Sequence, residues 1–266
     1  MTAGGLGTGR GRVAIITGVS RRIGIGAGIA RRLAADRWRL VLHAWAPHDA
    51  EQPWGADVGG LDAIVQDLEA GGAEVCTVSA DFADPDGVNR VMGAADDAYG
   101  HVDALIANHA RSSVQSLEEL TADELQRTFA VNTTATLLLT QAVAAQHDGR
   151  PGGRIVLFTS GQYHAAMPDE LPYIASKAAL HELTRSLAVH LAPRGITVNC
   201  VNPGPTDTGY VDDSGRRAVA ATNPGGRWGR PEDTARLVGW LVSDESAWVT
   251  GQTIASDGGW SARGGG

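Results

Sequence analysis

The chain has 266 residues, of which 43% are hydrophobic and 20% charged, so it is long and apolar enough to bury one sizeable core. Its net charge of −8 and the lack of any basic block argue against a nucleic-acid-binding protein. No apolar run reaches the roughly 18 residues of a membrane-spanning helix, and the N-terminus lacks the apolar core of a signal peptide, so we expect a cytoplasmic protein with no membrane partner.

Short apolar runs alternate with helical patterns along the chain. Strands are predicted at residues 13–16, 40–42, 75–78, 104–106, 155–158, 196–198 and 253–255. Helical periodicity follows the first strand through residue 34, and further helices are predicted at about 61–68, 88–98, 121–146, 173–191 and 231–243. Continuously apolar strands need cover on both sides, so this alternation predicts an α/β fold: a doubly wound, seven-stranded parallel sheet flanked by helices on both faces.

The alternation occupies residues 12–262, which we interpret as a single domain preceded by a flexible, glycine-rich tail at residues 1–11. Two stretches inside the domain, 46–56 and 204–230, lack the pattern. Each follows a strand, and the loops at the carboxyl ends of parallel strands build the ligand sites of such sheets. Both stretches are therefore candidate ligand-binding segments, and the glycine-rich stretch 204–230 is expected to be a mobile substrate loop.

The use of lysine and cysteine singles out three positions. The chain contains 21 arginines but a single lysine, Lys177. Arginine fills nearly every position where a generic cation would serve, so the lone lysine either marks a place that needs a compact, titratable ammonium or survived by chance. Cys76 and Cys200 lie far apart inside apolar runs and are predicted to be buried free thiols. No metal site is expected.

A glycine-rich turn at residues 17–26 joins the first predicted strand to the first helix. Glycines there let the backbone approach a pyrophosphate, and the helix N-terminus supplies amide donors. This turn resembles the T-G-x-x-x-G-x-G motif of the short-chain dehydrogenase/reductase family. The preferred alignment uses Gly18, Gly24 and Gly26 and treats Arg22-Ile23 as a two-residue insertion. The alternative ends the motif at Gly24 and places Arg22 where a glycine belongs.

Later motifs strengthen the resemblance, which covers roughly residues 12–260 and is closest in pattern to bacterial 3-oxoacyl-[acyl-carrier-protein] reductase-like members. Tyr173 and Lys177 form Y-x-x-x-K, a spacing that places both side chains on one helix face. Ser160 ends a strand thirteen residues before Tyr173, and Asn132 lies in the long predicted helix. The remaining matches are Asp81 after the third strand, Asn108 in a segment that departs from the family's N-N-A-G, and the P-G-x-x-x-T motif Pro203, Gly204 and Thr208.

The resemblance implies that Asn132, Ser160, Tyr173 and Lys177 are catalytic in a Rossmann-type oxidoreductase. Reduction of a ketone needs a proton donor, and tyrosine has an ordinary pKa of about 10, too high for easy proton exchange near neutrality. A neighbouring lysine ammonium favours the tyrosinate and is expected to lower the pKa of Tyr173. Ser160 would hydrogen-bond the carbonyl oxygen. Asn132 would hold a relay water, act as a structural amide, or do both.

Cofactor contacts are implied by the resemblance at Gly18, Ser20, Arg21, Gly24, Ile25, Gly26, Asp81, Phe82, Asn108, Tyr173, Lys177, Pro203, Gly204, Thr206 and Thr208. NAD-using Rossmann proteins place an acid at the end of the second strand, to hold the ribose hydroxyls. Here that strand ends in residues 42–45 with no acid. Arg21 matches a basic position of NADP-dependent members, and Arg22 adds a second cation. NADP(H) is therefore favoured over NAD(H).

The expected substrate pocket contains Gln162, His164 and Tyr210. His164 is interpreted as a pocket wall rather than a catalyst. Tyr163 is a competing tyrosine, but no lysine follows it at helical spacing. His109 is interpreted as a packing residue because the sequence shows no partner for it.

The sequence thus predicts an NADP(H)-dependent oxidoreductase that interconverts a ketone, either a 3-oxoacyl group or the carbonyl of a specialised metabolite, and a secondary alcohol. A Rossmann protein that binds or senses NADP(H) without catalysis is the alternative. The resemblance, together with apolar helices at 173–191 and 231–243, also predicts a homotetramer, with a homodimer as the alternative. The substrate is expected to be a small carbonyl or alcohol.

Overall fold

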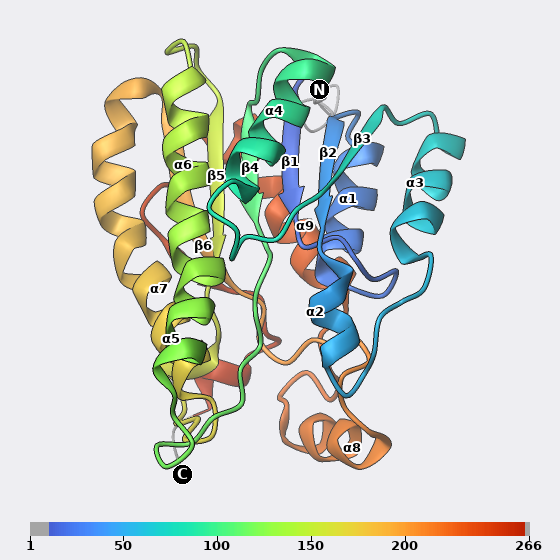
Figure 1. The fold of residues 1–266 in the computed structure, drawn as a ribbon, viewed down its shortest axis with the longest axis vertical. Helices are drawn as coiled ribbons and strands as arrows, with labels where there is room; N and C mark the ends of the chain where they lie inside the picture. The colour runs from blue at the N-terminus through green and yellow to red at the C-terminus, as the bar shows by residue number, and fades with distance from the viewer. Residues whose placement is uncertain (1–10, 264–266) are drawn as a thin grey trace, which may run out of the picture.

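The computed structural model describes residues 11–263, so the predicted flexible tail lies outside the described residues except for its last position. One seven-stranded parallel sheet runs through the molecule in the order β3-β2-β1-β4-β5-β6-β7 (Figure 1). Its strands are β1 (Val13–Thr17), β2 (Arg39–Ala44), β3 (Val75–Ser79), β4 (Ala104–Ala107), β5 (Gly153–Phe158), β6 (Ile196–Asn202) and β7 (Thr253–Ala255). The predicted fold class and strand number are confirmed.

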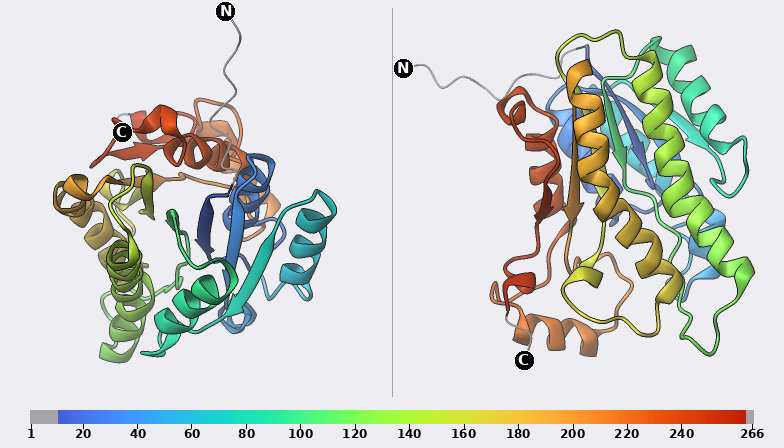
Figure 2. Two further views of the ribbon diagram at one scale, coloured as in Figure 1. Left: turned by 90° about the horizontal axis from the view of Figure 1, so that it is seen from above. Right: turned by 90° about the vertical axis from the view of Figure 1, so that its left-hand side faces the viewer.

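Helices cover both faces of the sheet (Figure 2). One face is packed by α1 (Ile25–Ala35), α3 (Gly60–Ala70) and α9 (Pro231–Leu241). The other is packed by α4 (Gly87–Tyr99), α6 (Ala135–Gln146) and α7 (Leu171–Leu191). Within residues 11–263, no helix is both long enough and apolar enough to cross a membrane.

The two faces of the sheet form two separate apolar cores. Successive residues of a strand point to opposite faces, so Ile15 packs into the core beneath α4 and α6, whereas Ile16 packs into the core beneath α1 and α9. Every residue of β1, β4, β5 and β6 is buried. This two-sided burial explains the continuously apolar strands seen in the sequence.

The helix predicted at 121–146 is interrupted by one wide turn. The structure has α5 (Ala122–Phe129), a π-helical segment at Ala130–Thr134, and then α6. Thr121 caps α5, because its hydroxyl accepts the backbone N–H of Glu124 at 3.2 Å. The π-helical turn contains the fully buried Asn132, and such turns are frequent at functional sites.

The two stretches without sequence periodicity each contain a helix that was not predicted. These helices are α2 (Ala46–Glu51) and α8 (Asp213–Thr222), and neither contains a buried residue. A helix with no buried face has no apolar stripe, which is why the periodicity did not show them. Both lie toward the carboxyl ends of the strands, at the lower side of Figure 1.

Candidate active site

The glycine turn between β1 and α1 is tightly packed against its neighbours. Gly18 has φ +74°, and a Cβ there would lie 2.8 Å from the Cα of His109. A Cβ on Gly26 would collide with the Gly18 carbonyl oxygen. Gly24 is the N-cap of α1, where no side chain caps the helix. The turn therefore leaves backbone amides available to an anion and has room for backbone only, which fits a pyrophosphate.

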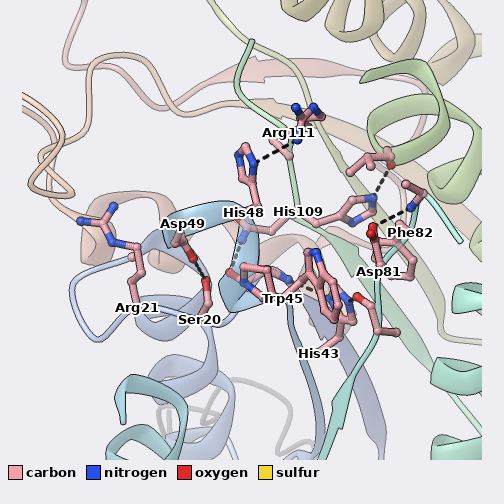
Figure 3. A pocket seen from close by; sticks show the side chains of 18 of the residues that line it. Ser20, Arg21, His43, Trp45, His48, Asp49, Asp81, Phe82, His109 and Arg111 are labelled. Carbon is pink, nitrogen blue, oxygen red and sulfur yellow. Dashed lines mark hydrogen bonds between the residues drawn. The ribbon is translucent and has the colours of Figure 1, made fainter. Parts of the chain in front are cut away.

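A cavity of about 360 Å³ opens over this turn (Figure 3). The expected cofactor residues that line it are Gly18, Ser20, Arg21, Gly24, Ile25, Asp81, Phe82, Asn108 and Thr208. Gly26 lies beneath the turn, and the Asn108 amide donates to the carbonyl oxygens of Thr17 at 3.0 Å and Gly18 at 3.1 Å. Asn108 thus holds the carboxyl ends of β1 and β4 together beside the cavity.

Aromatic rings form one wall of the cavity. His43 stacks on Phe82 with ring centroids 4.1 Å apart, and Phe82 contacts His109 at 4.4 Å. The Nε2 of His43 donates to the Ala80 carbonyl at 2.9 Å, so its Nδ1 is left to accept from the backbone N–H of Gly18 at 3.4 Å. Burial lowers the pKa of His43 to about 4. The imidazole is therefore neutral at physiological pH.

His109 has hydrogen-bond partners that its sequence context did not reveal. Its Nε2 donates to the Val131 carbonyl at 2.9 Å, and its Nδ1 lies 2.7 Å from the Thr17 hydroxyl. Burial lowers the pKa of His109 well below its ordinary value, with smaller contributions from His43 and Lys177 in the same direction. His109 thus does more than pack: it links β1 to the π-helical turn that contains Asn132.

The segment after β2 supplies an acid that the sequence argument did not anticipate. The carboxylate of Asp49, in α2, accepts a hydrogen bond from the Ser20 hydroxyl and another from Trp54 Nε1 at 3.4 Å. Asp49 lines the cavity, as do Trp45, Pro47, His48 and Glu51. The strand itself ends without an acid, as the sequence shows, and Asp49 comes five residues after its last residue. The expectation that 46–56 lines a ligand site agrees with this geometry.

The two arginines of the glycine turn have different surroundings. Arg22 is bound by Asp57, which accepts from its backbone N–H at 2.8 Å and from its guanidinium at 2.5 to 3.1 Å. Arg21 stands at the rim of the cavity, with its guanidinium 5.7 Å from the Trp54 ring centroid. Because Asp57 already neutralises Arg22, Arg21 is the better candidate for an anionic ligand.

Arg111 joins three elements around the cavity and was not singled out in the sequence. Its guanidinium donates to both carboxylate oxygens of Glu124 in α5 at 2.9 Å and lies 3.5 Å from Glu51 in α2. His48 Nε2 accepts the backbone N–H of Ser112 at 3.2 Å. In the sequence, the only indication of this arrangement was the unusual composition of the stretch 46–56, which contains the partners Glu51 and His48.

Lys177 and Tyr173 lie one turn apart on α7, next to the carboxyl end of β5. Lys177 is 2% exposed, and its ammonium donates to the Phe158 carbonyl at 3.2 Å. Its own carbonyl accepts the Thr159 hydroxyl at 3.0 Å, which ties α7 to the end of β5 just before Ser160. Burial lowers the pKa of Lys177 to about 8. The only lysine of the chain is therefore a buried, titratable amine beside Ser160 and Tyr173.

The pKa of Tyr173 moves in the direction opposite to our expectation. Burial raises it, and a hydrogen bond with the Ser160 side chain only partly offsets this. The Lys177 amine lies 5.9 Å from the Tyr173 ring centroid and is directed to a main-chain carbonyl, so desolvation dominates. The geometry brings Tyr173, Ser160 and Lys177 together, but by itself it does not lower the pKa of Tyr173.

Asn132 bridges two segments through its side chain. Its Oδ1 accepts the backbone N–H of Arg111 at 2.6 Å, and its Nδ2 donates to the Arg111 carbonyl at 3.1 Å and to the Ser176 hydroxyl at 2.9 Å. These bonds connect the π-helical turn to α7 and to the loop after β4. They match the structural-amide interpretation, while the relay-water role stays a prediction.

The other expected site residues do not line the described cavity. Pro203, Gly204 and Thr206 follow β6, and the buried Thr206 hydroxyl donates to the Pro203 carbonyl at 3.1 Å. A Cβ on Gly204, whose φ is +60°, would collide with Asp257. This turn packs against the chain after β7.

The three expected substrate-pocket residues differ in their surroundings. Gln162 accepts the backbone N–H of Ser160 at 3.1 Å and donates to the Thr159 hydroxyl at 2.9 Å, so it supports the strand end. His164 is exposed and packs on Tyr163, with ring centroids 3.8 Å apart. Tyr210 is 46% exposed and lies between the rings of Trp54 and Trp228, with centroids 6.2 and 5.9 Å away. Tyr210 thus connects the chain after β6 to the segment after β2 through Trp54.

Comparison with known proteins adds independent findings. The family profile described as Enoyl-(Acyl carrier protein) reductase matches residues 18–261. An uncharacterized oxidoreductase of Bacillus subtilis is 36% identical over 250 residues, which cover 93% of this chain and 96% of the relative. A blue fluorescent protein from a metagenomic library, solved in complex with NADPH, is 36% identical with a TM-score of 0.83, over 95% of this chain and 99% of its own. A promiscuous reductase that catalyses keto-reduction at C1 during lugdunomycin biosynthesis is 32% identical with a TM-score of 0.84, over 96% and 99% of the two chains.

Proposed function

The chain belongs to the short-chain dehydrogenase/reductase family, and from this premise we propose that it is an NADP(H)-dependent enzyme that interconverts a ketone and a secondary alcohol. The relatives are oxidoreductases, and one solved neighbour reduces a keto group. The observation that carries the proposal is the burial of the lone lysine one helical turn from Tyr173 and beside Ser160, at the carboxyl end of β5.

The nicotinamide, when bound, supplies or accepts the hydride. In the reducing direction the Ser160 hydroxyl donates a hydrogen bond to the substrate carbonyl oxygen and holds it beside Tyr173. The Tyr173 hydroxyl donates its proton to that oxygen as negative charge develops there. Lys177, whose pKa is about 8, stabilises the resulting phenolate and returns a proton to it. Asn132 keeps α7 in register with the π-helical turn through Ser176.

The choice of NADP(H) is supported by Arg21 at the cavity rim and by the solved neighbour in complex with NADPH. The Arg21 guanidinium would pair with the 2′-phosphate, and the Ser20 hydroxyl would donate to it. The fit of the glycine turn to a pyrophosphate applies equally to NAD(H). The proposed preference for NADP(H) over NAD(H) therefore depends on the side chains of Arg21 and Ser20.

The experiment is a panel of ketones and secondary alcohols, followed by absorbance of the reduced cofactor, with NADPH and NADH in parallel. We expect turnover of at least one ketone, faster with NADPH, and its loss in Tyr173→Phe. Tight NADPH binding without turnover of any ketone or alcohol would favour the other candidate, a protein that senses NADP(H). The buried Lys177 speaks against that candidate, since a sensor needs no titratable amine beside a tyrosine.

We further propose that the enzyme works in the cytoplasm as a homotetramer. Val189 at the end of α7 is 77% exposed and Trp248 is 97% exposed, and large apolar side chains of this kind mark surfaces that another subunit covers. Light scattering at micromolar concentration is expected to give the mass of four chains. A dimer would leave one of these surfaces uncovered, and a monomer would contradict the proposal.

A further inference from the structure

Three successive residues of the glycine turn are each engaged by the segment that follows β2. Ser20 donates to the carboxylate of Asp49, Arg21 lies over the ring of Trp54, and Arg22 is bound by Asp57. We call residues 49–57 the strap. It begins within α2, and its contacts mean that Ser20 and Arg21, the side chains that would receive a 2′-phosphate, already have partners within the chain. Figure 3 shows Asp49 beside Ser20.

Asp49 is the member of the strap that conflicts most directly with a phosphate. The Ser20 hydroxyl has one proton to donate, so it cannot serve Asp49 and a 2′-phosphate at once. A carboxylate and a phosphate that compete for one donor also repel each other, by an amount that grows as water is excluded. An unmodified ribose carries hydroxyl groups instead, and these can donate to a carboxylate.

The geometry points to Asp49 as a specificity-determining residue that holds Ser20 away from the 2′-phosphate and so reduces the enzyme's preference for NADP(H) over NAD(H). This inference rests on the proposed cofactor site. Arg21 attracts the 2′-phosphate and Asp49 opposes it. Binding of NADP(H) then requires the Asp49 carboxylate to release Ser20, whereas NAD(H) can bind with that hydrogen bond intact.

The test compares adenosine 2′,5′-bisphosphate with adenosine 5′-monophosphate by titration calorimetry, which needs no catalysis. The Asp49→Asn variant keeps the shape of the side chain and removes its charge. We expect it to raise the affinity for the bisphosphate by roughly tenfold relative to the monophosphate, the scale of removing a close charge repulsion at a partly exposed site. The Asp49→Ser variant is expected to shift the ratio in the same direction, and it keeps the test available if the asparagine variant does not fold.

Glu51→Gln is the matched control, because it removes the same charge from the same helix. The Glu51 carboxylate lies 3.5 Å from Arg111 and does not contact Ser20. We expect this variant to change the affinity ratio by less than about twofold because Glu51, although it also lines the cavity, is paired with Arg111 and does not compete for the Ser20 hydroxyl. An equal change in the Asp49 and Glu51 variants, or no change in either Asp49 variant, would overturn the inference.

Turnover of the wild-type enzyme separates this inference from the proposed function. If the wild type reduces ketones with NADPH but the Asp49 variants bind both nucleotides as the wild type does, only the role of Asp49 is wrong. If no carbonyl is turned over with either cofactor, the proposed function fails, while the nucleotide affinities still decide what Asp49 does.

Discussion

The two sides of the proposed cofactor and substrate cleft are built differently. Tyr173 and Lys177 belong to α7, a 21-residue helix with seven buried residues that packs against β5 and β6. The strap at 49–57 and the helix α8 belong to segments whose helices bury no residue at all. The groups proposed for proton transfer are therefore held by the core, and those proposed for recognition are held by surface contacts.

The difference between a core-held side and a surface-held side matches the different requirements of proton transfer and ligand recognition. Proton transfer needs atoms fixed within a few tenths of an ångström, and a buried amine such as Lys177 can have its pKa set by desolvation. Ligand recognition needs groups that can exchange one partner for another, as Ser20 can exchange Asp49 for a ligand. Substitutions on the core side should therefore change the rate of chemistry, and those on the surface side should change affinity and loop motion.

The largest effect is expected on the core side, in Lys177→Arg and Tyr173→Phe. The guanidinium of Lys177→Arg keeps the positive charge, but its planar shape does not fit a site built around a compact amine. We expect each substitution to lower kcat by at least about 100-fold, the scale of general acid–base catalysis, with the fold retained. Steady-state kinetics and circular dichroism measure the two quantities.

The double variant provides the control for that prediction. Residues that act as one unit give non-additive losses, so Lys177→Arg combined with Tyr173→Phe should be little worse than either alone. Near-full turnover in Lys177→Arg would contradict the mechanism and would remove the contrast between the two sides of the cleft.

The second-largest expected effect is a loss of folding stability at low pH, caused by the buried histidines beside the cavity. The folded protein holds His43 neutral with a pKa of about 4, whereas the unfolded chain protonates it near 6.5. Its contribution to stability is therefore complete above pH 6.5 and is lost as the pH falls toward 4, by roughly 3 kcal/mol. Protonation would also place a proton on the Nδ1 that accepts from Gly18. Urea unfolding between pH 7 and 4 measures the slope.

His43→Asn should flatten that slope, leaving the part due to His109, whose pKa burial also lowers. Asp81 is the acid whose charge favours the protonated His43, and burial outweighs it. A wild-type slope in His43→Asn would show that the aromatic wall is not the acid-sensitive part.

The third expected effect is a loss of NADPH affinity when Arg21, on the surface side of the cleft, is replaced. Removing a charged hydrogen bond to the 2′-phosphate in Arg21→Ala should weaken NADPH binding by about 1–3 kcal/mol and leave NADH binding almost unchanged. The matched control is Arg22→Ala, because Asp57 already binds Arg22. Titration of both cofactors measures the effect. Equal losses for NADPH and NADH in Arg21→Ala would mean that Arg21 only shapes the turn.

The smallest effect is a change in motion without a change in fold. The region 204–230, including α8, has few buried residues, so its amides should exchange rapidly with solvent. Addition of NADPH and a ketone substrate should slow exchange there more than in α7, whose amides are already protected by packing. Hydrogen exchange followed by mass spectrometry tests this. Unchanged exchange in 204–230 would remove the idea of a substrate loop that closes.

The sequence by itself determined the fold class, because the central strands β1, β4, β5 and β6 are buried on both faces and so appear as continuous apolar runs. It also indicated Tyr173, Lys177 and the glycine turn, since their chemistry depends on local spacing along one helix or one turn. The exception within the helices was Asn132, whose position in a helix was predicted but whose π-helical turn leaves no mark in an apolar pattern.

Tertiary structure decided the partners of these residues. The Asp49 contact to Ser20 spans 29 residues of sequence, and the His109 contact to Thr17 spans 92. Helix and strand periodicity relates only residues that are close in the sequence. Side chains that meet across 29 or 92 residues follow no such period, so a single sequence carries no signal of their pairing. Burial decided the rest: desolvation raises the pKa of Tyr173 and lowers that of Lys177, and it depends on every element packed around α7 rather than on the motif alone.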